Sequence, residues 1–132
     1  MRTLLAGLLI GLSTLHAAIS PDHIRRLQEE AAEALVIKAD RVEVKTTLGK
    51  DGRQLDVQVT ASVQSVLRSK AGHKPGDVVK IAYTIIETVI PMPGPGQPKV
   101  LEKGETVRAY LNPSADRQIL GLAVYGHSFQ QP

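Results

Sequence analysis

The residues of this chain best suited to chemistry are its histidines. After the first twenty residues the chain contains His23, His73 and His127, and it has no cysteine. A zinc site needs histidines at strand or helix spacing together with a carboxylate, but no His-x-His or His-x-x-x-His pattern occurs. We therefore expect no metal and no other cofactor, and we interpret His23 and His73 as surface or capping residues.

His127 is the most reactive candidate because Ser128 follows it directly. A base beside a hydroxyl can activate a nucleophile, so a small periplasmic hydrolase or metal-dependent enzyme using His127 and Ser128 is the alternative function. Two features disfavour it. The segment 126–130 lacks the second glycine of a nucleophile elbow, and adjacent residues of a strand point to opposite faces. We expect no catalytic residue and a non-enzymatic protein.

A loop rich in proline and glycine is a better candidate for a functional site than these histidines, as a binding site for a partner. Residues 91–98 contain four prolines, which lack amide donors, so the segment is neither a helix nor a central strand. A tight turn at 74–77 is a second exposed feature. We expect another protein to dock at this loop, at the turn or along a strand edge. The candidate contact residues are Met92, Pro93, Gly94, Pro95, Gly96, Gln97, Lys74 and Pro75.

Composition disfavours several other partners. The formal net charge is only +3, and the basic residues are scattered along the chain. A nucleic-acid-binding domain normally shows a clustered basic face, and stacking on bases or sugars needs exposed aromatic rings. Only three tyrosines and one phenylalanine are present. We therefore expect no nucleic-acid partner.

The first eighteen residues predict a signal peptide. Arg2 precedes an apolar run from Leu4 to Leu12, and Leu15-His16-Ala17 or the following Ala18 offers a small-residue cleavage site. The run is shorter than the roughly 20 residues of a membrane-spanning helix. We expect an exported protein, periplasmic or secreted, with one domain over residues 19–132 and no membrane anchor after cleavage. Its oligomeric state stays open.

Local patterns predict one helix followed by strands. Ser20-Pro21-Asp22 is typical of a helix start, and helical spacing of apolar residues predicts a helix over about 21–34 that packs on a sheet. Asp51-Gly52 predicts a hairpin turn. Strict alternation then predicts a long strand from Leu55 to Val63, with a phase slip at Ser65 that is typical of a β-bulge. Further strands are predicted over 78–90, 106–111 and 119–125.

These elements predict a mainly β domain: a small antiparallel curved sheet or a closed OB-like barrel of five to six strands with one N-terminal helix. Three segments, 59–66, 74–81 and 101–111, resemble small secreted barrels of the oligonucleotide/oligosaccharide-binding (OB) architecture, including the netrin-like and metalloproteinase-inhibitor-like group. The resemblance covers about half of the chain. Inhibitors of that group chelate zinc through an N-terminal cysteine, which this chain lacks, so the resemblance implies architecture rather than activity.

Overall fold

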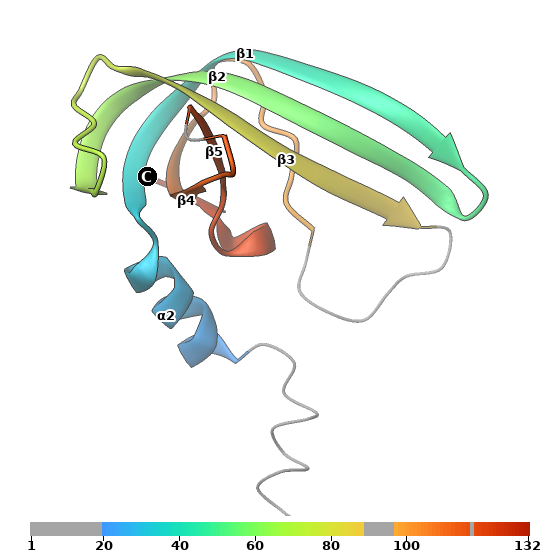
Figure 1. Cartoon of the computed structure of the whole chain (residues 1–132), viewed down its shortest axis with the longest axis horizontal. Helices are drawn as coiled ribbons and strands as arrows, with labels where there is room; N and C mark the ends of the chain where they lie inside the picture. The colour runs from blue at the N-terminus through green and yellow to red at the C-terminus, as the bar shows by residue number, and fades with distance from the viewer. Residues whose placement is uncertain (1–19, 89–96, 117) are drawn as a thin grey trace, which may run out of the picture.

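The computed structural model describes residues 20–88, 97–116 and 118–132 (Figure 1). The predicted signal peptide and the loop residues Met92 to Gly96 lie outside these ranges. The described residues form one helix, six strands and one 3₁₀ turn. In chain order they are α2 (Pro21–Glu30), β1 (Glu33–Gly49), β2 (Gly52–Ser69), β3 (Val78–Thr88), β4 (Thr106–Pro113), β5 (Ile119–Leu122), η1 (Tyr125–His127) and β6 (Phe129–Gln130).

The strands pair around a closed ring. The order is β1-β2-β3-β5-β4-β6, and an additional pairing between β1 and β4 joins the two sides. All pairings are antiparallel except that of β3 with β5, which is parallel. The prediction of a small, mainly β fold is confirmed. The sheet is mixed rather than purely antiparallel, because a closed ring of five strands cannot alternate direction at every pairing and one neighbouring pair must be parallel.

β1, β2 and β3 form a long curved sheet that extends past the shorter strands (Figure 1). Every second residue of β2 from Leu55 to Val63 is buried, as the alternation predicted. The register between β1 and β2 shifts at three places, two of which flank Ser65 on β2. The predicted irregularity is thus confirmed, and such bulges increase local twist and bend. Strands β1, β3 and β4 and the connection before β4 supply the rest of the core. Its chief residues there are Leu35, Ile37, Ile81, Leu101, Val107 and Leu111.

The connection before β4 crosses beneath the long strands. Its Leu101 is buried, and the Tyr83 hydroxyl donates to the carbonyl of Lys99 at 2.7 Å and accepts from the Leu101 amide at 3.3 Å. The ring of Phe129 meets Tyr83 edge-on, with centroids 5.5 Å apart. These contacts hold the segment that follows residue 97 against the core face of the long sheet, beside Tyr83 of β3.

The helix differs from its prediction. It starts as expected, with the Ser20 hydroxyl accepting from the His23 amide at 3.1 Å, but ends at Glu30 because Ala31 is extended, with ψ of 135°. The predicted span to residue 34 was too long, because Glu33 already pairs in β1. None of its residues is buried, so it does not pack broadly on the sheet. Arg68 anchors its C-terminal end instead, donating to the carbonyls of Gln28 and Ala31 at 2.6 and 2.9 Å.

The predicted last strand, 119–125, is also shorter than expected. β5 ends at Leu122, and the chain then bends through η1. Tyr125 adopts a φ of 48°, a value that a non-glycine residue rarely takes. This bend returns the C-terminus to β4, where Phe129 and Gln130 pair with Ala109 and Arg108.

Candidate functional site

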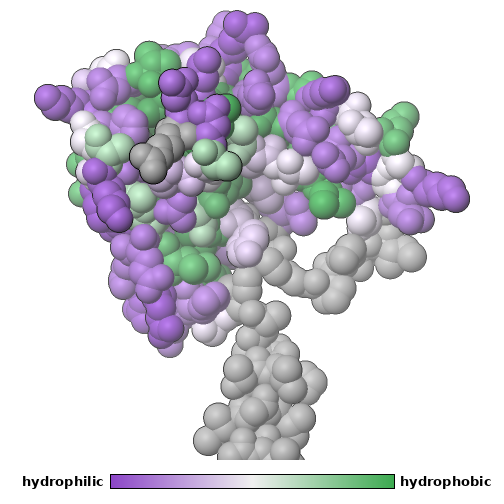
Figure 2. All heavy atoms as spheres, in the orientation of Figure 1, coloured by the Kyte–Doolittle hydropathy of each residue, from purple (hydrophilic) through white to green (hydrophobic). Residues whose placement is uncertain are grey.

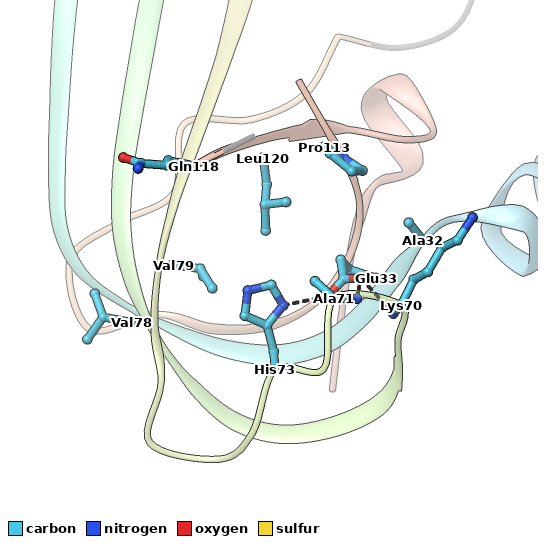
Figure 3. Close-up of a pocket in the computed structure, with 10 residues that line it drawn as sticks. All are labelled: Ala32, Glu33, Lys70, Ala71, His73, Val78, Val79, Pro113, Gln118 and Leu120. Atoms are coloured by element: carbon cyan, nitrogen blue, oxygen red, sulfur yellow. Dashed lines mark hydrogen bonds and ion pairs between the residues drawn. The ribbon is translucent and has the colours of Figure 1, made fainter. Parts of the chain in front are cut away.

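A pocket of about 520 Å³ opens at the end of the sheet where β2 turns into β3. The turn supplies one wall, the start of β3 a second, and the end of β4 with the start of β5 the third (Figure 3). The lining residues are Ala32, Glu33, Lys70, Ala71, His73, Val78, Val79, Pro113, Gln118 and Leu120.

Glu33 is the buried carboxylate that organises this end of the molecule. It lies at the first position of β1 and is only 1% exposed. One carboxylate oxygen, Oε2, accepts from the amides of Lys70 and Ala71 at 2.8 and 3.2 Å. The other, Oε1, accepts from the Ser69 hydroxyl and pairs with His73 Nδ1 at 2.5 Å. A buried charge needs partners of this kind, and here they all come from one turn.

These partners also determine the charge of Glu33. Burial by itself raises the pKa of a carboxyl group, but the hydrogen bonds from Ser69, His73 and the Ala71 amide favour the ionised form. Their combined effect is larger, so the pKa of Glu33 lies below its ordinary value. Glu33 is therefore an ionised carboxylate at neutral pH and acts as an acceptor.

His73 receives its orientation from this carboxylate. An ionised carboxylate can only accept, so His73 Nδ1 carries the proton that it shares with Glu33. The ring then points its other nitrogen, Nε2, into the pocket on the side of Val79 (Figure 3). The side chain of His73 is 23% exposed, so part of the ring can be reached from solvent.

Ser69, His73 and Glu33 have the residue types of a catalytic triad but not its geometry. In a triad the serine contacts one ring nitrogen and the acid contacts the other. Here Ser69 Oγ lies 3.3 Å from Nδ1, the same nitrogen that pairs with Glu33, and its proton is donated to the carboxylate. Ser69 also accepts from the His73 amide at 2.8 Å. This serine stabilises the turn and is not activated as a nucleophile.

The rest of the pocket is largely apolar. The side chains of Val79 and Leu120 face the His73 ring, and Pro113 closes the opposite wall (Figure 3). Lys70 and Gln118 belong to the lining but extend their polar ends away from the centre (Figure 3). The His73 ring therefore supplies the polar group at the centre, in surroundings that suit an apolar ligand group.

The residues predicted for partner binding are only partly described. Lys74 and Pro75 lie in the exposed β2–β3 turn, where the Lys74 amide donates to Asp77 at 2.9 Å. Gln97 is exposed, and its side chain accepts from the amide of Ile86 at 3.3 Å. The turn lies next to the pocket, whereas Gln97 lies beside the far part of β3. The structure does not bring these residues together into one surface.

The alternative His127–Ser128 site is not assembled for catalysis. Ser128 is fully buried, and its hydroxyl accepts from the Val124 amide at 2.8 Å. His127 lies exposed at the end of η1. A substrate that reaches the imidazole cannot reach the hydroxyl, because Ser128 has no exposed surface.

His73 and Glu33 were not recognised as a pair in the sequence. The interpretation of His73 as a surface or capping residue missed this contact, since its ring turns inward against Glu33. One signal was available: Glu33 is the only charged residue between Glu30 and Lys38. An isolated acid in an apolar stretch needs a partner, although the sequence does not say which one.

No group of three or more His, Asp or Glu side chains within residues 20–88, 97–116 and 118–132 is placed to hold a metal ion. No helix in those ranges is long and apolar enough to cross a membrane.

Comparison with known proteins adds no relative. No family model matches the chain, and neither a curated protein nor a solved structure is significantly similar to it.

Proposed function

We propose that this protein is an exported, non-enzymatic binding module that captures an apolar side chain of a partner protein in the pocket beside His73. The observation that supports this proposal is the pocket. A partly open apolar pocket with one oriented polar group is the usual form of a binding site. Export is supported by the sequence pattern of the first eighteen residues.

The chemistry of the pocket suggests which group it accepts. Val79 and Leu120 offer apolar contact, and His73 Nε2 offers one hydrogen bond. Because Glu33 holds the other ring nitrogen, the ring needs no reorganisation when a ligand arrives. A partner segment with one apolar side chain beside a backbone or side-chain hydrogen-bond donor fits this arrangement, because Nε2 is the acceptor nitrogen of the ring.

The closed pairing of β1, β2, β3, β5 and β4 supports an OB-like architecture for the module. Such a scaffold is used for many unrelated activities, so the architecture by itself does not specify a ligand. The hydrolase alternative has less support, because the buried hydroxyl of Ser128 is inaccessible to a substrate.

The pocket can be tested with 4-phenylbutanol, which joins an apolar ring to one hydroxyl that can donate to His73 Nε2. We expect it to shift the amide NMR signals of Ala71, Val79 and Leu120. Pro113 forms the wall opposite His73 and is exposed, so Pro113→Lys adds a charge there without opening the core and should abolish the shifts. Ile86→Lys is the control, because Ile86 is 55% exposed at the end of β3 that lies far from the pocket. Equal shifts in the two variants would contradict the pocket assignment.

The partner can be tested in the exporting host with a photo-crosslinking amino acid at position 113 or at position 86. We expect a protein adduct from position 113 that disappears when free 4-phenylbutanol competes. The same adduct from position 86, or an adduct insensitive to the competitor, would refute docking at the pocket.

A further inference from the structure

One edge of β1 is left without a neighbouring strand. β4 pairs with β1 only from Glu33 to Lys38. The Ala39 amide then donates to Glu105 at 2.9 Å, and its carbonyl accepts from Gly104 at 2.7 Å. Beyond Ala39, no strand of the described ranges pairs with this side of β1 as far as Gly49. Figure 1 shows β1 along the outer border of the long sheet in this region.

The backbone groups that face outward along this edge can be identified from the neighbouring strands. Val63 bonds toward β3, since its amide and carbonyl contact Asp77 and Gly76, each at 2.8 Å. Because backbone groups alternate in direction along the unbroken β2–β3 pairing, the amides and carbonyls of Thr60, Gln58 and Asp56 point toward β1. The residues opposite them in β1 are Arg41, Glu43 and Lys45, so the backbone groups of these three residues bond to β2. The intervening residues Val42, Val44, Thr46 and Leu48 therefore present amides and carbonyls at the edge.

The side chains on this edge are unusual for an unpaired strand. Leu48 is 81% exposed and Val44 is 45% exposed, both on the face of the sheet that elsewhere forms the core. On this side of the molecule, small apolar groups lie among hydrophilic ones and extend to the far end of the long strands (Figure 2). Edge strands normally resist pairing through charge, lysine above all. Here Lys45 is accompanied by Glu43 two residues away, on the opposite face from Val44.

We propose that this edge binds a second copy of the chain, antiparallel, with Val44 opposite Val44 of the second copy. In this register Glu43 lies opposite Lys45 of the second copy, and the two-fold axis repeats the pair. Val42 likewise lies opposite Thr46 of the second copy. Opposite charges facing each other across strands are favourable, and the outward amides and carbonyls then form a regular ladder.

Charge and the position of the bulge together select this register over its neighbours. A two-fold axis perpendicular to the sheet must pass through one residue pair, because paired residues share a face. Centring it on Glu43 or on Lys45 places identical charges directly opposite each other. Centring it on Val42 places Glu43 opposite Arg41, but it brings the bulge at Asp40 into the new ladder opposite Val44 and leaves Lys45 without an opposite charge. Centring it on Thr46 leaves Glu43 and Lys45 without opposite charges. The Val44 register is the one that pairs both Glu43 and Lys45 with an opposite charge and keeps the bulge away from its centre.

The Arg41–Glu43 ion pair is compatible with this assembly. Arg41 Nη2 lies 2.5 Å from Glu43 Oε1, but the Glu43 side chain is still 53% exposed. Its second oxygen can accept from a lysine across the edge. Glu43 would then lie between two cations, one from its own strand and one from the second copy.

The test is a charge exchange, read by sedimentation equilibrium of the purified protein over a concentration series. We expect a concentration-dependent dimer. Glu43→Lys and Lys45→Glu should each weaken it by at least about tenfold, because each places like charges opposite each other. The double variant Glu43→Lys/Lys45→Glu should recover dimerisation to within about threefold of the original.

A mixture of the two single variants gives the sharpest outcome. One copy then carries lysines at positions 43 and 45 and the other carries glutamates, so every pair in the proposed register is opposite in charge. We expect the mixture to dimerise at least as strongly as the original protein. Arg26→Glu, an exposed charge reversal on α2, is the control and should leave dimerisation unchanged.

Three results would overturn the proposal. They are a protein that remains monomeric at millimolar concentration, single variants that dimerise like the original, and a mixture no stronger than its components. Misfolding does not imitate the expected result, because a misfolded variant is not rescued by mixing.

Discussion

At the scale of single residues, Glu33 determines the structure of a turn that lies far from it in the sequence. It is the first residue of β1, yet its partners lie 36 to 40 positions further along the chain. One carboxylate thereby fixes both the path of the β2–β3 turn and the tautomer of His73. A buried acid with four donors is costly to replace, because its donors are then left unsatisfied or poorly matched.

We predict that Glu33→Gln destabilises the fold by about 1 to 3 kcal/mol at neutral pH. The pKa of Glu33 in the folded protein lies below its ordinary value of 4.5, so the folded state binds this proton more weakly than the unfolded chain. The stabilisation from the carboxylate is complete above pH 4.5 and is lost as the pH falls through the lowered pKa. Urea unfolding should show the difference between the original protein and the variant shrinking in acid.

Glu29→Gln is the control for that experiment, because Glu29 is exposed on α2. It should change the free energy of unfolding little at any pH. A difference between the original protein and Glu33→Gln that is constant down to strong acid would contradict the ionised carboxylate.

Tyr83 gives a second pH-dependent prediction, at the alkaline end. Burial, with a smaller contribution from Glu105, raises the pKa of Tyr83 from 10.0 to about 12 despite the Leu101 amide, which favours the ionised form. The neutral phenol therefore stabilises the fold fully below pH 10 and loses this effect as the pH approaches 12. The shift corresponds to about 2 to 3 kcal/mol.

We expect Tyr83→Phe to be less stable than the original protein at neutral pH by about 1 kcal/mol, since the Lys99 carbonyl and the Leu101 amide lose a partner. Above pH 10 its disadvantage should disappear, because it has no phenol to ionise. Tyr125→Phe, at a residue 62% exposed, should follow the original protein. Denaturant midpoints measured on both sides of pH 10 decide between these outcomes.

At the scale of elements, the β1–β2 hairpin depends on one backbone conformation. Gly52 has a φ of 151°, and a Cβ atom built there would lie 1.9 Å from the carbonyl oxygen of Glu87 in β3. Gly49, at the other end of the same turn, meets the nearest atom at 3.6 Å, which is an ordinary contact. The two glycines of one turn therefore have different roles.

Gly52→Ala should destabilise the protein by about 1 to 3 kcal/mol or more, because backbone strain adds to a backbone clash with β3. Gly49→Ala should cost less than about 1 kcal/mol. Thermal unfolding of the two variants, measured side by side, checks the difference. Equal losses of stability would mean that β3 does not pack against Gly52 as described.

At the scale of the whole molecule, the two proposed binding surfaces lie at opposite ends of the long sheet. The pocket opens at the β2–β3 turn, and the free edge of β1 runs toward the β1–β2 hairpin (Figure 1). A dimer through the edge therefore leaves each pocket open. Two copies would present two pockets, which strengthens the capture of a partner with repeated segments.

Export is a prediction for the whole chain. If the first eighteen residues act as a signal, the protein recovered outside the cytoplasm should begin at Ala18 or Ile19, as N-terminal sequencing would show. Leu9→Arg interrupts the apolar run and should retain the protein inside the cell with Met1 in place. Recovery of the unaltered chain from cytosol, still beginning at Met1, would contradict export.

The sequence by itself determined the local elements. A period of two predicted the strands because alternate residues of a strand face opposite sides, and Asp51-Gly52 predicted the hairpin because glycine tolerates its backbone angles. The helix start at Ser20 followed from its capping hydroxyl. Its end did not, because Ala34 and Leu35 continue the helical spacing of apolar residues but pair in β1 with distant residues of β2 and β4.

Only the tertiary structure decided how the elements combine. The parallel contact of β3 with β5, the closure of β1 on β4 and the pairing of Glu33 with His73 join residues far apart in the chain. Local propensity has no information about such contacts, since their free energy depends on residues that are distant in the sequence. For the same reason the pocket and the unpaired edge of β1 could not be found before the strands were placed in space.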